Sequence, residues 1–161
     1  MKPYLLTSET KRKNLKAIDK IFKFRELLLL NMEIKKIYLF GSFLNLKKRK
    51  FAEWGDIDIA IISNDFKGMD GNERRKYIDA FIFNIGSIPS VPLKNEDLLN
   101  YYGDPNKDIF FDCFCYTPKE FDAEMFLFIS KIKKRYRKVE KNFKQIFLKD
   151  FQMVEDKNEP L

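Results

Sequence analysis

Two aspartates separated by one residue, Asp56 and Asp58, stand at the start of the apolar run DIDIAII. Side chains of an extended strand alternate between its two faces. Both carboxylates would therefore project from one face, while Ile57, Ile59 and Ile61 enter a core. Two carboxylates on one face repel each other unless a cation joins them, and Mg²⁺ is typically held by one or two carboxylates together with substrate phosphates. The spacing therefore predicts a site for a metal-bound nucleotide.

A second motif, Gly41-Ser42, follows the apolar run IYLF and could hold phosphate. Glycine permits the positive φ of a tight strand-to-helix turn and a close approach of the backbone to a ligand. Ser42 would stand at a helix N-terminus, where free backbone N–H groups and the helix dipole favour an anion. Lys47 and Lys48, in the basic stretch that follows, could add point charges for the phosphates or could form a solvated loop.

A third acid, Asp112, lies in the run FFDCFCY, whose composition predicts a strand buried on both faces. An unpaired carboxylate in such a strand is costly, so Asp112 needs a metal ion or a structural salt bridge. In the first case it would share a second metal ion with the Asp-x-Asp pair. It could also act as the general base that activates an acceptor hydroxyl.

The order of these motifs resembles that of the minimal nucleotidyltransferases of the DNA polymerase β superfamily. The resemblance covers roughly residues 35–130. It implies an α+β, nucleotidyltransferase-like fold with a mixed central sheet flanked by helices. It also implies an enzyme that uses Mg²⁺ or Mn²⁺ to move a nucleoside monophosphate from a nucleoside triphosphate to an acceptor. The metal-binding and catalytic residues would be Asp56, Asp58 and Asp112. The nucleotide-binding residues would be Gly41, Ser42, Lys47 and Lys48.

The acceptor is undetermined by the sequence. Small members of this family include antitoxins that modify or bind a cognate toxin, so the resemblance implies an acceptor protein, a small helical partner, as in toxin–antitoxin pairs. One alternative is a non-catalytic, antitoxin-like binding module, because the loop between Ser42 and Asp56 is longer than in compact members. Another is a transferase that acts on nucleic acid, with basic segments as its track.

Composition limits the remaining possibilities. At 161 residues and 45% hydrophobic, the chain is long enough for one domain with a sizeable core. We expect that domain over residues 1–152 and a disordered tail over residues 153–161. The net charge of +7 favours anionic partners. The chain contains no histidine, which excludes Ser-His-Asp triads and histidine-based zinc sites.

The two cysteines and the apolar segments indicate the compartment. Cys113 and Cys115 are too close for a Cys-x-x-Cys motif, so buried, reduced thiols are expected. No apolar stretch approaches the length of a membrane span, and the N-terminus lacks the apolar run of a signal peptide. We expect a cytoplasmic protein that does not bind membranes.

Helices and strands must position these residues, and their patterns are readable in the sequence. A helix is predicted from Thr7 or Ser8 to about Met32. The predicted strands are 34–40, 57–62 and 108–116. The other predicted helices are 73–84 and 119–132, the latter with Pro118 at its first turn.

The C-terminal segment, residues 131–151, is dense in Lys and Arg with apolar residues near a 3–4 residue spacing. This pattern predicts a helix with one apolar face. Its basic face could grip a polyanion or could simply be solvated. Tyr136, Val139 and Phe143 look committed to docking on the domain or on a partner. Nucleic acid is therefore a possible partner that the sequence does not favour.

Overall fold

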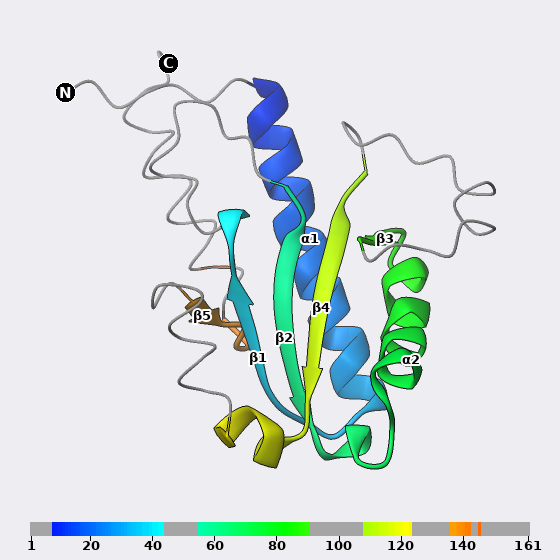
Figure 1. Ribbon diagram of the computed structural model, residues 1–161. Helices are drawn as coiled ribbons and strands as arrows, with labels where there is room; N and C mark the ends of the chain where they lie inside the picture. Colours follow the sequence, from blue (N-terminus) through cyan, green and yellow to red (C-terminus); the bar gives the residue numbers. More distant parts are fainter. Residues whose placement is uncertain (1–7, 44–54, 91–107, 124–135, 143–144, 146–161) are drawn as a thin grey trace.

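A central sheet with two long helices is the framework of this chain in the computed structural model, which describes residues 8–43, 55–90, 108–123, 136–142 and 145 (Figure 1). The elements in chain order are α1 (Ser8–Asn31), β1 (Ile34–Phe40), β2 (Ile57–Ser63), the 3₁₀ helix η2 (Asn64–Phe66), α2 (Gly71–Asn84), β3 (Ile88–Pro89), β4 (Phe110–Tyr116) and β5 (Tyr136–Lys138). No helix among the described residues is long and apolar enough to cross a membrane.

The sheet has five strands in the order β3-β4-β2-β1-β5. Strand β4 runs parallel to both of its neighbours, β2 and β3, whereas β1 runs antiparallel to β2 and β5. The predicted α+β fold with a mixed central sheet is therefore confirmed.

One face of the sheet carries the main core. Helix α1 crosses behind the strands in Figure 1, and α2 packs beside β3 and β4. The alternate residues Ile57, Ile59 and Ile61 of β2 are fully buried in this core, together with Phe24 of α1 and Ile78 of α2. The sequence prediction that the isoleucines of β2 enter a core is thus confirmed. Because side chains alternate, the other positions of β2 must lie on the opposite face.

That opposite face carries a smaller, aromatic cluster. Tyr38, Phe40 and Phe121 are buried there with Ala60 and Ile62. Partly buried aromatic residues pack against them, namely Phe114, Tyr116 and Tyr136. The ring centroids of Phe40 and Phe114 are 5.4 Å apart. The sheet is thus apolar on both faces, and Asp58 and Asp112 lie near the starts of β2 and β4.

The predicted elements over residues 34–40, 57–62, 73–84 and 108–116 are observed within a few residues of their predicted bounds, as is the first helix. Helix α2 begins earlier than predicted because Asp70 is its N-cap and accepts a hydrogen bond from the backbone N–H of Glu73 (2.8 Å). Residues 118–123 are helical, which places Pro118 in the first turn as predicted. The rest of that helix, 124–132, and the predicted tail, 153–161, lie outside the described residues.

The prediction of a helix over residues 131–151 is wrong for the segment 136–138, which forms strand β5. This strand pairs with β1 in the register Tyr38↔Lys138, and the N–H of Val139 donates to the carbonyl of Ile37 at 2.8 Å. The local pattern, half-buried Tyr136 and buried Val139 around exposed basic residues, does not separate a short edge strand from a helix. The unpaired backbone groups of β1 decide the outcome.

Candidate active site

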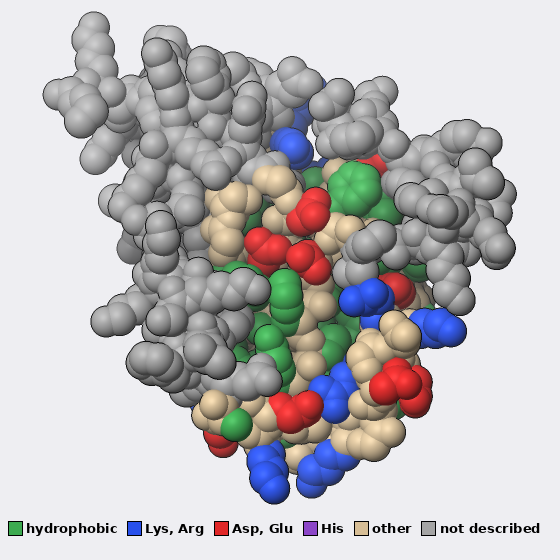
Figure 2. Space-filling model, viewed as in Figure 1, with side chains coloured by type: hydrophobic (Ala, Val, Ile, Leu, Met, Phe, Trp, Pro, Cys, Tyr) green, Lys and Arg blue, Asp and Glu red, His purple; other side chains and the backbone are tan. Residues whose placement is uncertain are grey.

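The predicted acids come together where β2 and β4 begin. Asp58 of β2 is the register neighbour of Asp112 of β4, so the two side chains lie side by side on one face of the sheet. Asp56 precedes β2 by one residue and is exposed. In Figure 2 acidic side chains gather over this part of the sheet, on the face turned away from α1. The prediction of Asp56 and Asp58 on a common face is consistent with this arrangement.

Gly41 closes the site on the side of β1. Phe40, the last residue of β1, is the register partner of Asp58, so the turn at Gly41 passes beside the carboxylate. Gly41 has φ = 82°, which few other residues adopt. A Cβ atom on Gly41 would lie 2.0 Å from Oδ2 of Asp58. Only glycine therefore lets the chain turn here while the Asp58 carboxylate keeps its position.

Ser42 joins the two ends of the loop that separates the motifs. Its Oγ accepts a hydrogen bond from the N–H of Gly55 (3.2 Å), one residue before Asp56. Residues 42–43 have a helical backbone, and Phe43 is fully buried in the main core. The side chain of Ser42 thus links the Gly41-Ser42 turn to the backbone next to Asp56. Lys47 and Lys48 lie outside the described residues.

The electrostatics of the site depend on Asp58. Burial of its carboxyl group, with the negative charges of Asp112 and Asp56 nearby, raises its pKa to about 7. A cation placed between these carboxylates would reverse that effect, because it favours the charged form. Asp112 is half-buried, and no residue of β4 is exposed. Side chains of β4 pack against both apolar clusters, so the strand is largely buried on both faces, as predicted.

We tested whether these residues fit a divalent ion. Among the residues that the structure describes, no three side chains of Cys, Asp or Glu surround a common point. Mg²⁺ commonly takes only one or two carboxylates and completes its shell with water and substrate phosphates. Asp58 and Asp112, side by side and mutually repelling, fit that smaller requirement. Asp56 could join them from the exposed side.

Sequence reasoning missed Ser90. The N–H of Ile88 donates to the carbonyl of Ile109, and the N–H of Ser90 donates to the carbonyl of Phe111, so Ser90 continues the β3–β4 ladder beside Asp112. The Oγ atom of Ser90 is buried and makes no hydrogen bond to any residue that the structure describes. Neighbouring positions across the sheet are therefore occupied by Gly41, Asp58, Asp112 and the hydroxyl group of Ser90. We call this set the acidic row. Ile88-Pro89 is too short and too proline-rich to signal a strand.

The two thiols beside Asp112 are not part of the acidic site. Cys113 and Cys115 are free and partly buried against the main core. Burial raises the pKa of both thiols, that of Cys115 to about 12, so neither is a thiolate near neutral pH.

Comparison with known proteins agrees with the geometry. Residues 15–94 match the family model of the nucleotidyltransferase domain, a stretch that includes Gly41, Ser42, Asp56 and Asp58. This stretch of the chain is therefore similar to a nucleotidyltransferase domain, a class of domain whose substrate is a nucleotide.

One solved structure, described as a candidate nucleotidyltransferase from Sulfolobus solfataricus, is 14% identical over 73% of this chain and 81% of that chain, with a TM-score of 0.45. A likeness at this level is too weak to assign a function. None of the curated proteins compared with this chain matches it significantly.

Proposed function

We propose that the chain is a metal-dependent nucleotidyltransferase that moves a nucleoside monophosphate from a nucleoside triphosphate to a hydroxyl group of an acceptor and releases pyrophosphate. The side-by-side placement of Asp58 and Asp112 on the open end of the sheet is the observation that carries this proposal. The match of residues 15–94 to the nucleotidyltransferase domain supports the reaction class. The elevated pKa of Asp58, about 7, supports the cation requirement.

Each residue has a separate part in this reaction. The backbone around Gly41 and Ser42 would bind the terminal phosphates, since a glycine with positive φ exposes N–H groups at the end of β1. Asp56 and Asp58 would hold Mg²⁺ or Mn²⁺ beside those phosphates. When bound, the ion supplies positive charge that polarises the phosphate being attacked. Asp112 would accept the proton of the acceptor hydroxyl as general base.

The order of strands orients the two substrates. Gly41 lies at the end of β1, next to β2, whereas Asp112 lies on the other side of Asp58. If the triphosphate occupies the β1 side, the acceptor must approach from the β4 side, over Asp112 and Ser90. For the acceptor we propose a protein, a small helical partner as in toxin–antitoxin pairs. This finer assignment rests on the resemblance of the motifs to those of small family members.

Calorimetry with a non-hydrolysable ATP analogue tests the site without knowledge of the acceptor. We expect the analogue to bind in Mg²⁺ and to bind at least about tenfold more weakly in EDTA, because the phosphates and the carboxylates repel each other without the ion. Asp112→Asn should abolish transfer and preserve the fold, because the amide has nearly the same volume but cannot accept the proton. The matched control is Asp122→Asn, the same change at an exposed acid.

Equal affinity in Mg²⁺ and EDTA would reject the metal-dependent transferase. Metal-dependent binding of the analogue without transfer to any protein or nucleic acid would instead favour the non-catalytic binding module. Transfer to nucleic acid, and not to a protein, would support the alternative of a transferase that acts on nucleic acid.

A further inference from the structure

An open cavity of about 250 Å³ lies at the edge of the sheet, where α1, β1 and the residues after β5 meet. Its apolar lining includes Ile37 and Val139. Among the described residues, the charged side chains that line it are five cations and one acid. The cations are Arg25, Lys35, Lys36, Lys138 and Lys141, and the acid is Glu140. The cavity thus combines an apolar floor with a strongly basic rim.

A local irregularity brings two consecutive lysines into the same cavity. In a regular strand Lys35 and Lys36 would point to opposite faces. The register of β1 against β2 shifts between Ile34 and Lys36, as in a β-bulge. Bulges re-aim side chains at the edges and ends of sheets. Both lysines therefore line the cavity.

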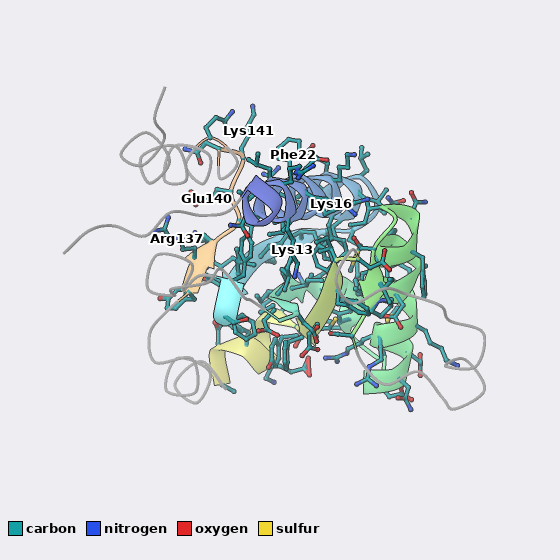
Figure 3. All side chains as sticks on the ribbon, turned by 90° about the horizontal axis from the view of Figure 1, so that it is seen from above. Lys13, Lys16, Phe22, Arg137, Glu140 and Lys141 are labelled. Atoms are coloured by element: carbon teal, nitrogen blue, oxygen red, sulfur yellow. The ribbon has the colours of Figure 1, made fainter. Side chains whose placement is uncertain are left out.

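Arg25 fastens the opposite wall. Its Nε donates to the carbonyl of Val139 (3.3 Å), and its Nη1 lies 2.6 Å from a carboxylate oxygen of Glu26. The guanidinium bridges α1 and the chain after β5, where only 14% of its side chain is exposed. Figure 3 shows Glu140 and Lys141 beside α1. Arg25 and the backbone at Val139 are therefore held in place before any ligand binds.

The rim carries more positive than negative charge. Lys35 pairs with Glu33 (3.1 Å) and Lys138 with Glu140 (3.7 Å), but all four side chains are about half-exposed or more. Exposed pairs of this kind contribute little and exchange partners readily. In the described part of the chain neither Lys36 nor Lys141 has an ion pair. Several cations can therefore turn toward one anion.

We propose that this cavity is an anion site that binds a phosphate group, independent of the nucleotidyl-transfer site. Its apolar residues Ile37 and Val139 belong to the helix-side core, whereas Asp58 and Asp112 lie on the opposite face of the sheet. Lysines are point-charge donors suited to phosphate, and the apolar floor accommodates a sugar or base attached to it. The phosphate comes either from a free mononucleotide or from a nucleic-acid strand, which share this chemistry.

Nuclear magnetic resonance titration of the full-length chain tests the proposal. Inorganic phosphate, AMP and a short oligouridine would be added separately at constant ionic strength, in EDTA to exclude binding through a metal ion. We expect saturable shifts of the backbone amides of Lys36, Val139 and Lys141. The double variant Lys36→Gln/Lys141→Gln should bind about tenfold more weakly, since it removes two charge-assisted contacts. The double variant Lys67→Gln/Lys76→Gln makes the same charge change at exposed lysines outside the cavity and should bind normally.

Three outcomes are informative. Tighter binding of oligouridine than of AMP, with a slope of log K against log salt of about −0.7 per phosphate contacted, would identify a strand as the source. Equal binding of AMP and oligouridine would identify the free nucleotide. Absence of saturable shifts with all three probes, or equal losses in both double variants, would overturn the proposal. Failure of metal-dependent nucleotide binding on the acidic face leaves these readouts unaffected.

Discussion

At the scale of single residues, the charged form of Asp58 lowers the stability of the folded protein. Asp58 is partly buried beside two other carboxylates, and burial with these charges raises its pKa to about 7. Folding therefore holds a proton on this group that the unfolded chain releases near 3.8. As pH rises from about 4 to 7 the unfolded state loses its proton first, so Asp58 contributes progressively less to stability. The carboxylate is retained at a cost to the fold, which is typical of a functional group.

Asp58→Asn should therefore stabilise the metal-free protein. At pH 8 we expect a gain of about 1–2 kcal/mol, less than the full pKa shift corresponds to because solvent screens a half-buried group. The gain should shrink below pH 7 and vanish near pH 4. Urea unfolding at pH 4, 6 and 8 measures it. A loss of stability at pH 8 would show that Asp58 is satisfied by partners within the fold.

Gly41→Ala should damage both the fold and the site. The new Cβ would lie 2.0 Å from Oδ2 of Asp58 and the residue would keep a positive φ, so we expect a loss of about 2–4 kcal/mol. Gly68→Ala is the matched control, because Gly68 also has positive φ (78°) but has open space around it. It should cost only about 1–2 kcal/mol. Thermal unfolding compares them, and equal losses would mean that the Asp58 carboxylate moves aside freely.

At the scale of elements, α2 is fastened to the turn after β4 by one arginine. Nη1 of Arg74 lies 2.8 and 3.0 Å from the two carboxylate oxygens of Glu120 and 3.2 Å from the carbonyl of Cys115. Its Nε donates to the carbonyl of Met69 (3.0 Å). Glu120 in turn accepts from the N–H of Thr117. The C-terminal end of the strand that carries Asp112 is thereby fixed to the helix.

Arg74→Lys should destabilise the domain by about 1.5–3 kcal/mol, since lysine keeps the charge but cannot reach these partners as a planar fork. Arg75→Lys, an exposed neighbour on the same helix, should change stability by less than about 0.5 kcal/mol. Burial acts to raise the pKa of Glu120, but hydrogen bonds from Arg74 and Thr117 outweigh it and lower the pKa. The contribution of the pair should accordingly disappear as pH falls below about 4.5. Chemical unfolding at pH 7 and pH 3 measures both effects, and similar losses in the two variants would reject this role.

The elements also show what sequence patterns can and cannot predict. Strands β1, β2 and β4 were predictable because apolar runs of β-branched and aromatic residues are bounded by Gly, Asp and Pro. The same patterns placed Gly41 directly after one strand, Asp58 at the start of the next and Asp112 within the third. Strands β3 and β5 are two and three residues long, and their pairing depends on exposed backbone groups of β4 and β1. Such tertiary pairing leaves no periodic signal in the strand itself.

At the scale of the whole molecule, the sheet lies between an acidic site and a basic cavity. The face turned away from α1 carries Asp58 and Asp112 near the starts of their strands, and the face that packs on α1 carries the basic cavity at one edge. The chain as a whole has a net charge of +7, so anions are attracted to it while the acidic face repels them locally. If the proposed function is correct, a nucleotide reaches the acidic face only together with a divalent cation, and the binding of that cation depends on pH.

Binding of Mn²⁺, followed by electron paramagnetic resonance, should strengthen with pH through the pKa of Asp58. Because this group carries its proton below about pH 7, we expect affinity at pH 6 to be about tenfold lower than well above pH 7. Asp58→Asn should bind Mn²⁺ weakly at both values and lose the dependence. If the affinity of the wild type for Mn²⁺ is the same at pH 6 and pH 8, Asp58 does not bind the ion.

The alternation of β2 has an evolutionary consequence. Ile57, Ile59 and Ile61 fill the core, and Asp58 between them faces the opposite side of the sheet. Deletion or insertion of one residue inside this strand would exchange the two sets of side chains, so both the core and the acidic row would be lost in one step. Homologues can therefore differ in β2 by substitution but not by insertion or deletion. Differences in length should accumulate in the connections between strands, so the distance along the chain from Gly41 to Asp58 can vary while the spacing within β2 stays fixed.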